Sequence, residues 1–230
     1  MKKSAFLALI LLGAIAQASN YTTKTIKTAK AGSYEATTSY LVWASSHPLA
    51  RVANPVLKNW AMRQHESWIK EILKAQKEEG KPSSAWEQEI DMEVVRGDIR
   101  IISVNASIYD YSGGAHPNHG SESFNFAMVG GKPKQLKLED LFRKGSSPGK
   151  MVSALVIAKL KNEEGADLVQ SGEVKALTVM QLNHFSIGVD GMTWYFDPYE
   201  VGPYVAGAFE VKLTWKELGP NLNRSMVLGR

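Results

Sequence analysis

The chain has 230 residues, with 27 Lys and Arg against 23 Asp and Glu, and it contains no cysteine. Without cysteine, disulfides, thiolate zinc sites and a cysteine nucleophile are all excluded. A formal net charge of +4 over this length gives no concentrated basic face, so we expect no nucleic-acid partner. No apolar run reaches the roughly 20 residues that a membrane-spanning helix needs, so we expect no membrane span.

The first residues have the pattern of a secretory signal peptide. Lys2 and Lys3 precede an apolar stretch that ends at Ile15, and Ala16 and Ala18 flank Gln17 as at a cleavage site. Residues 1–18 are therefore predicted to be a signal peptide, and their removal would take away half of the net charge. We expect a periplasmic or secreted protein that is stabilised by its core alone.

The next segments are predicted to be a leader and a small subdomain. Residues 19–39 are rich in Thr, Lys, Ser and Ala, which favours a flexible leader or an edge strand. Residues 40–82 are expected to hold a strand and a long helix, with Asn54 as N-cap, Pro55 at the first helical position and Gly80 at the end. The apolar side chains that recur at helical spacing are Leu57, Trp60, Ala61, Trp68 and Ile72.

Residues 83–220 form the predicted main domain, which begins with a series of strands. Apolar and acidic residues alternate from Trp86 to Val94, which is typical of a strand with one buried face. Three further strand segments follow at 99–109, 123–129 and 135–138, with Gly97-Asp98 and Gly130-Gly131 as turns. The four segments predict an antiparallel meander.

The rest of the main domain is predicted to hold a second helix and three more strands. Ser147 is expected to cap a helix with Pro148 at its first position and Gly165 at its end. Asp190-Gly191 favours a type I′ turn between two alternating segments, and 209–215 is the last predicted strand. Residues 221–230 are expected to be a tail. The fold class is therefore α+β, an antiparallel sheet meander packed with two main helices.

The stretch from Tyr109 to Gly120 is the first candidate binding segment. It is expected to be a loop between two strands, in which histidines and an aspartate could hold a metal or present a polar surface, while a purely structural loop also explains the glycines. Because Pro117 prevents the two histidines from sharing a helical face, no metal site is predicted. The candidate binding residues here are Asp110, Tyr111, Gly113, Gly114, His116 and His119.

The second candidate segment runs from Trp194 to Tyr204. Asp197 and Glu200 could form a carboxylate pair for acid–base work on a glycan, but Asp-Pro is also a common start of a turn. Tyr199 and Tyr204 suit contact with a sugar ring or a protein partner. All four residues are candidate binding residues, and no catalytic residue is predicted.

Two signatures together resemble one bacterial family. The Tyr-Ser-Gly-Gly-Ala-His core of 109–120, with 124–126 and 136–142 after it, is the first, and 196–207 is the second. Both are similar to an extracytoplasmic domain family of unknown function. This family forms the lysozyme-binding ectodomain of RsiV-type anti-sigma factors and the N-terminal region of some peptidoglycan deacetylases. Residues 40–82 are similar to the smaller domain that commonly precedes it.

The resemblance implies a binding function rather than a reaction. No sigma-binding segment and no deacetylase domain is recognised, so neither activity carries over. We expect an exported, non-enzymatic cell-envelope binding module without a cofactor, which engages a lysozyme-like protein or peptidoglycan. The alternative is a cell-wall hydrolase or metal-dependent envelope enzyme that uses the region of His116 and Asp197.

Overall fold

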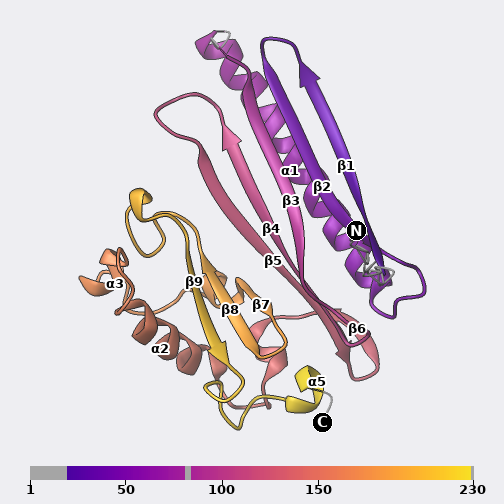
Figure 1. The fold of residues 1–230 in the computed structure, drawn as a ribbon, viewed down its shortest axis with the longest axis vertical. Helices are drawn as coiled ribbons and strands as arrows, with labels where there is room; N and C mark the ends of the chain where they lie inside the picture. Colours follow the sequence, from indigo (N-terminus) through magenta and orange to yellow (C-terminus); the bar gives the residue numbers. More distant parts are fainter. Residues whose placement is uncertain (1–19, 81–83, 229–230) are drawn as a thin grey trace, which may run out of the picture.

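The computed structural model describes residues 20–80 and 84–228, so the predicted signal peptide lies outside the described residues. Within this part, a long six-stranded sheet carries a helix along one face, and a three-stranded sheet with short helices adjoins it (Figure 1). The α+β class is confirmed, and α1 and α2 are its two longest helices. None of the described helices is both long and apolar enough to cross a membrane.

The six strands of the large sheet lie in the order in which they occur in the chain. They are β1 (Tyr21–Lys30), β2 (Tyr34–Trp43), β3 (Trp86–Gly97), β4 (Ile101–Tyr111), β5 (Asn118–Val129) and β6 (Lys132–Gln135). The predicted antiparallel meander is confirmed for β3 to β6, but its last strand lies at 132–135 rather than at the predicted 135–138. Strands β2 and β3 are parallel, because a helix carries the chain back between them. This pairing was not predicted, since the hydrophobic pattern along a single strand does not identify its neighbour.

The flexible leader expected at 19–39 is wrong. Most of this segment forms β1 and the start of β2, which pair antiparallel from Tyr21 opposite Trp43 to Lys30 opposite Tyr34. The edge-strand alternative holds for β1, which has only one neighbour in the sheet. Its Thr and Lys side chains are mostly exposed, and such polar residues protect an edge strand from pairing with another molecule.

Helix α1 (Ala50–Glu79) begins earlier than predicted. Asn54 is not its N-cap, because its side chain accepts from the N–H of Trp43 at 2.8 Å and donates to the carbonyl of Trp43 at 2.9 Å. Pro55 therefore lies inside the helix, where its ring nitrogen has no hydrogen to donate. The predicted end is confirmed, since Gly80 follows the helix with a φ of 94°.

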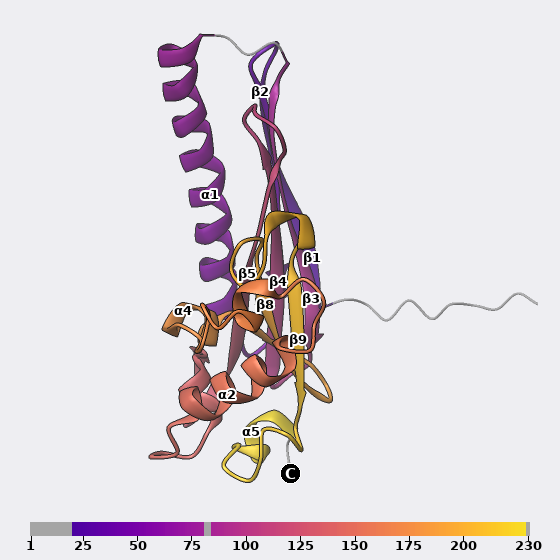
Figure 2. The same ribbon diagram turned by 90° about the vertical axis from the view of Figure 1, so that its left-hand side faces the viewer.

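Helix α1 packs along one face of the large sheet (Figure 2). The predicted apolar face of the helix is buried there. The opposite face of the sheet belongs to a second core, because Ile101 and Ala127 pack with the C-terminal elements while Ile102 and Phe126 pack with α1. Successive side chains of a strand point to opposite faces, so β4 and β5 serve both cores.

The C-terminal elements form the second unit. They are η1 (Leu138–Leu141), α2 (Pro148–Leu160), α3 (Asp167–Gln170), α4 (Val179–Asn183), β7 (Phe185–Ile187), β8 (Gly191–Phe196), η2 (Tyr204–Ala206), β9 (Phe209–Thr214) and α5 (Arg224–Leu228). Ser147 precedes α2 as predicted, but its φ is 46° and its side chain makes no capping hydrogen bond. The helix ends at Leu160 rather than at Gly165, because residues 161–165 form turns.

The β7–β8 hairpin is confirmed, but its turn differs from the predicted type I′. Neither Asp190 nor Gly191 has a positive φ, and the N–H of Gly188 donates to the carbonyl of Gly191 at 2.8 Å. The tail expected at 221–230 is also wrong for its described part. Leu222 forms a β-bridge with Phe142, and Val227 of α5 is fully buried.

Candidate functional site

The first candidate segment is a hairpin rather than a long loop. Strand β4 runs to Tyr111 and β5 starts at Asn118, so only residues 112–117 connect them. Asp110 and Tyr111 therefore lie on β4, and His119 lies on β5. Gly113 and Gly114 occupy the connection with φ values of 88° and 100°, which other residues rarely adopt.

The tip of this hairpin contacts the second candidate segment. The rings of His116 and Tyr204 stack with their centroids 3.8 Å apart, and the ring of Tyr199 lies 5.6 Å from that of Tyr204. The hydroxyl of Tyr204 donates to the carbonyl of Pro117 at 2.6 Å. We call His116, Tyr199 and Tyr204 the aromatic patch, which joins two segments that are far apart in the sequence.

Tyr199 is held in an unusual backbone conformation. Its φ is 74°, in the left-handed region, and its side chain is 62% exposed. Two hydrogen bonds close the turn around it. The N–H of Glu200 donates to the carbonyl of Asp197, and the N–H of Asp197 donates to the carboxylate of Glu200 at 2.7 Å. Such strain persists only where surrounding contacts fix it, and it places an aromatic ring in solvent beside Tyr204.

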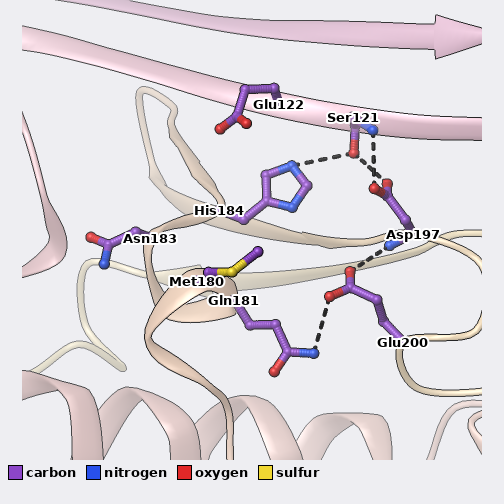
Figure 3. A pocket seen from close by; sticks show the side chains of 8 residues that line it. All are labelled: Ser121, Glu122, Met180, Gln181, Asn183, His184, Asp197 and Glu200. Atoms are coloured by element: carbon purple, nitrogen blue, oxygen red, sulfur yellow. Dashed lines mark hydrogen bonds between the residues drawn. The ribbon is translucent and has the colours of Figure 1, made fainter. Parts of the chain in front are cut away.

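A pocket opens beside this turn, and we call it the edge pocket. It encloses about 310 Å³. It lies at the side of β5 that faces away from β4, where β6 pairs only with residues 126–129 and leaves the earlier part of β5 without a neighbouring strand. The residues that line it are Ser121, Glu122, Met180, Gln181, Asn183, His184, Asp197 and Glu200 (Figure 3).

Ser121 is at the centre of the polar contacts in the edge pocket. Asp197 accepts from its hydroxyl at 2.7 Å and from its N–H at 3.1 Å, so the carboxylate caps the free edge of β5. The Nε2 atom of His184 lies 3.2 Å from the Ser121 hydroxyl oxygen. Because the single hydroxyl hydrogen points to Asp197, His184 must donate through Nε2.

Glu200 and Gln181 extend this network. Gln181 donates its side-chain amide to Glu200 at 3.1 Å. The position of Gln181 is itself fixed by a capping box at the start of α4, in which Thr178 accepts from the N–H of Gln181 and Gln181 accepts from the N–H of Thr178. The carboxylate of Glu200 is thus held from two sides by protein groups.

Glu122 contributes a third carboxyl to the pocket, and its pKa is raised, so its ionisation is disfavoured. Desolvation within the pocket is the main cause that raises its pKa, and the negative charge of Asp197 acts in the same direction. His184 and the N–H of Ser123 act in the opposite direction but do not outweigh it.

The geometry differs from that of a serine hydrolase. In a catalytic triad the serine hydroxyl donates to the histidine, and the aspartate holds the other ring nitrogen of that histidine. Here Ser121 donates to Asp197 and accepts from His184, so the histidine is not placed to take the serine proton. The arrangement suits hydrogen bonding to a ligand, with carboxylates as acceptors and Gln181 and Asn183 at the rim.

The structure brings together five of the candidate residues: Asp197, Tyr199, Glu200 and Tyr204 of the second segment, with His116 of the first stacked on Tyr204. The others lie apart from the edge pocket. Asn118 donates to Asp110 at 3.1 Å, the ring of His119 packs on Tyr109, and the hydroxyl of Tyr111 donates to the carbonyl of Gly114. Within 20–80 and 84–228, no three His, Asp or Glu side chains are grouped as metal ligands.

Most of the residues that line the edge pocket were missed by sequence reasoning. Ser121 and Glu122 lie within a strand, and the candidate segment stopped at Gly120. The Thr178-x-x-Gln181 spacing of a capping box could have located α4, which carries Met180 and Asn183. No local signal places His184 beside Ser121, because 63 residues separate them and only the packing of the two sheets brings them together.

Comparison with known families divides the chain into two matched regions. Residues 14–119 match the model of the deacetylase PdaC, and residues 139–216 match the model of a family described as a protein of unknown function, DUF3298. The edge pocket is made mainly by the DUF3298 region, while Ser121 and Glu122 lie between the two matched regions. No curated protein matches the chain.

Two solved structures share the fold. A DUF3298 family protein from Pseudomonas aeruginosa PAO1 is 15% identical, with a TM-score of 0.65 over 91% of this chain and 97% of that chain. A second member, from Bacteroides fragilis NCTC 9343, is also 15% identical, with a TM-score of 0.57 over 91% of this chain and 98% of that chain. At this identity they show the fold alone.

Proposed function

Because the chain joins a PdaC-type N-terminal region to a DUF3298 domain, we propose that it is an exported, non-enzymatic module that binds a cell-wall glycan. The PdaC match links the N-terminal region to a deacetylase, and this link supports a peptidoglycan context and an extracytoplasmic location. The signal-peptide pattern of residues 1–18 supports the same location. The glycan would occupy the edge pocket and lie against the aromatic patch.

One observation carries the proposal. One turn carries both two carboxylates that line the pocket and an exposed aromatic ring, because Tyr199 lies between Asp197 and Glu200 in the sequence. Sugars are bound through hydroxyl groups, which donate to carboxylates, and through their apolar ring faces, which pack on aromatic side chains. This turn offers both kinds of contact on one surface.

The hydrogen bonds of Ser121 favour binding over hydrolysis. The hydroxyl donates to Asp197 rather than to His184, and His184 is oriented as a donor toward the serine oxygen. A nucleophilic serine would need its proton directed at a group that can remove it. The same donors and acceptors are well placed for the hydroxyl groups of a saccharide.

A titration of the intact chain with soluble peptidoglycan fragments tests the proposal. We expect saturable binding that Asp197→Asn and Tyr204→Ala each weaken at least tenfold. Asp190→Asn is the matched control, because Asp190 is an exposed turn aspartate of the same small sheet that pairs with Lys212, away from the pocket. Unchanged glycan binding in both site variants would contradict the assignment.

Two further arms separate the alternatives. If the chain bound a lysozyme but not the glycan, the ligand of the module would be a protein rather than a glycan. Release of reducing ends from peptidoglycan by the intact chain, abolished by Ser121→Ala, would show a hydrolase and overturn the non-enzymatic function. We expect neither result.

A further inference from the structure

A groove runs between the edge strand β1 and the second half of α1, and we call it the helix groove. In this part of the helix, Trp68 and Ile72 pack with side chains of β2 and β3, so the helix does not cover β1. Thr28 of β1 and His65 of α1 both line the groove, and their side chains contact each other at 2.8 Å. The groove has a volume of about 920 Å³ and shares no lining residue with the edge pocket.

Aliphatic side chains from both elements form the apolar surface of the helix groove. They are Ile26 of β1 and Ile69 and Leu73 of α1, and all three are partly buried. Ile69 and Leu73 also pack against a core cluster, whereas Ile26 belongs to none of the three apolar clusters of the described residues. Strand β1 thus places an aliphatic side chain in the groove, and the apolar chain of a ligand would remove it from water.

Lysines surround this apolar surface on both elements. Three of them line the groove from α1: Lys70, Lys74 and Lys77. None of the three takes part in an ion pair within residues 20–80 and 84–228. On β1, the alternation of side chains places Lys24 and Lys30 on the same face as Ile26. The surroundings of the apolar surface therefore favour a ligand with a negative charge.

Two glutamates also line the groove, and their positions set the direction of such a ligand. Glu66 lies beside His65, before the first of the three lining lysines, and Glu71 follows that lysine. The end of the groove near His65 thus carries a negative charge, while the three lysines outnumber one glutamate toward the end of the helix. An anionic group is attracted to the outer end, and its apolar chain then extends toward Ile26.

The shape of the groove suits one amphiphile in solution rather than a membrane surface. Side chains that enter a bilayer must protrude, but the three aliphatic side chains here are partly buried between a strand and a helix. The described aliphatic side chains with the largest exposed fractions lie on other segments: Ile99, Val179, Met180, Val189 and Val205. The groove can therefore take up a single acyl chain without offering protruding apolar contacts to a bilayer.

We propose that the helix groove binds a single fatty acid, with its acyl chain on Ile26, Ile69 and Leu73 and its carboxylate among the lysines of the outer end. The groove volume lies within the range of about 300–1,000 Å³ that is usual for small-molecule sites. The site does not depend on the edge pocket, so the failure of one proposal leaves the other intact.

Calorimetric titration of the intact chain with three probes, each below its micelle or solubility limit, tests this site. Decanoate carries both the chain and the charge, 1-decanol carries the chain without the charge, and hexanoate carries the charge on a shorter chain. We expect saturable binding of decanoate and at least tenfold weaker binding of 1-decanol. Hexanoate should also bind at least tenfold more weakly, because four fewer CH₂ groups are removed from water.

Two matched pairs of variants locate the binding. Ile26→Gln changes the groove without touching a core cluster, and Ile99→Gln, in the exposed connection between β3 and β4, is its control. We expect at least a tenfold loss of decanoate affinity in the first and no change in the second. The double variant Lys74→Gln, Lys77→Gln should weaken decanoate binding to the level of 1-decanol and leave 1-decanol binding unchanged. Lys58→Gln, at an exposed position of the same helix outside the groove, is its control.

Four outcomes would overturn the proposal. Equal affinities for decanoate and 1-decanol would remove the role of the lysines. Decanoate binding that Ile26→Gln leaves unchanged would place the acyl chain elsewhere. Binding to vesicles of an anionic phospholipid without binding of decanoate would show that this side of the molecule contacts a membrane surface. The absence of saturable decanoate binding to the intact chain would show that the groove holds no fatty acid.

Discussion

Asn125 donates its side-chain amide to the backbone carbonyl of Phe185 at 2.6 Å, which joins the large sheet to the free side of β7. Ser103 completes the contact, because its hydroxyl donates to Asn125 at 2.7 Å and accepts from the N–H of Ile187 at 2.9 Å. Strand β7 pairs with β8 on one side only. Two side chains thus take the place of a neighbouring strand and satisfy backbone groups that would otherwise be buried unpaired.

This contact predicts a stability loss in Asn125→Leu. The change keeps the approximate volume and leaves the carbonyl of Phe185 and the hydroxyl of Ser103 without their partner in a buried interface. We expect the free energy of unfolding to fall by about 2–4 kcal/mol, since each orphaned polar group costs about 1–3 kcal/mol. Urea unfolding at neutral pH measures it.

A double-mutant cycle tests the coupling between the two side chains. Ser103→Ala and Asn125→Ala should show an interaction energy of about 0.5–3 kcal/mol, as expected for residues in one hydrogen-bond network. Additive effects of the two changes would contradict a shared network. Asn162→Ala, in the exposed turn that follows α2, is the control and should change stability by less than about 0.5 kcal/mol.

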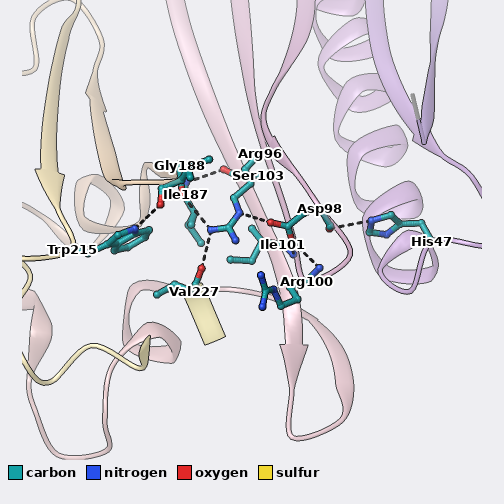
Figure 4. Close-up of polar contacts among 11 residues, drawn as sticks. His47, Arg96, Asp98, Arg100, Ile101, Ser103, Ile187, Gly188, Trp215 and Val227 are labelled. Atoms are coloured by element: carbon teal, nitrogen blue, oxygen red, sulfur yellow. Dashed lines mark hydrogen bonds and ion pairs between the residues drawn. The ribbon is translucent and has the colours of Figure 1, made fainter. Parts of the chain in front are cut away.

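Arg96 forms a second link between the two units (Figure 4). Its Nη1 donates to the carbonyls of Gly188 and Val227, and its Nε donates to Asp98 at 2.7 Å. The side chain is only 8% exposed, so these bonds hold a charge that is largely removed from water. The carbonyl of Asp98 in turn receives a contact from His47, which lies just before α1.

Arg96→Met is expected to lower the free energy of unfolding by roughly 2–3 kcal/mol, because the carbonyls of Gly188 and Val227 lose a charged donor. We also expect faster hydrogen exchange in α5, whose Val227 the arginine holds. Arg100→Met changes an exposed side chain two residues beyond Asp98 and is the control. Unchanged exchange at 224–228 in Arg96→Met would show that α5 is held by its apolar contacts alone.

The sequence was informative where one periodicity governs one element. The buried face of α1, the alternation of β3 and β9, and the β7–β8 hairpin all follow from local patterns of apolar residues. The errors arise where a side chain bonds outside its own element. Asn54 has the sequence position of a helix cap, but Trp43 offers it a strand-like pair of backbone groups.

The candidate site was predictable only in part. Aromatic and acidic residues between 194 and 204 marked the turn, and Tyr204 of this second candidate segment stacks on His116 of the first. Ser121 and His184 could not be found, because each is unremarkable among its neighbours in sequence. Their contact depends on where β6 stops along β5, which is set by the length of a turn and the packing of α4.

The lowered pKa of His65 leads us to predict a loss of stability on acidification. The ring is buried between Thr28 of β1 and Thr38 of β2, and desolvation lowers its pKa below the ordinary 6.5, although the nearby charge of Glu66 opposes this. The unfolded chain takes up a proton near pH 6.5 while the folded protein does not. Stability is therefore complete above pH 6.5 and declines as the pH falls toward the folded pKa.

Removal of the ring tests this origin. In His65→Gln, the change in unfolding free energy between pH 7.5 and pH 5.5 should be smaller than in the original chain. The difference in slope is at most about 1.4 kcal/mol per pH unit, the value for one proton. Thermal or urea unfolding over this range measures it, and parallel pH profiles of the two proteins would contradict the role of His65.

The raised pKa of Glu122, in the edge pocket, leads us to predict the opposite pH dependence of stability. Since desolvation raises its pKa above the ordinary 4.5, the folded protein keeps the proton at a pH where the unfolded chain has lost it. Stability from this group is therefore present below pH 4.5 and is lost as the pH rises through the folded pKa. At pH 7 the ionised carboxylate costs stability, which a neutral amide of the same shape avoids.

Glu122→Gln should therefore raise the free energy of unfolding at pH 7 by a few tenths of a kcal/mol and leave it nearly unchanged at pH 4. Glu200→Gln is the matched comparison in the same pocket. It should destabilise the protein at pH 7, because the Glu200 carboxylate accepts from both the N–H of Asp197 and the amide of Gln181. Urea unfolding at the two pH values distinguishes the variants, and a loss of stability in Glu122→Gln at pH 7 would show that its carboxylate is paired rather than penalised.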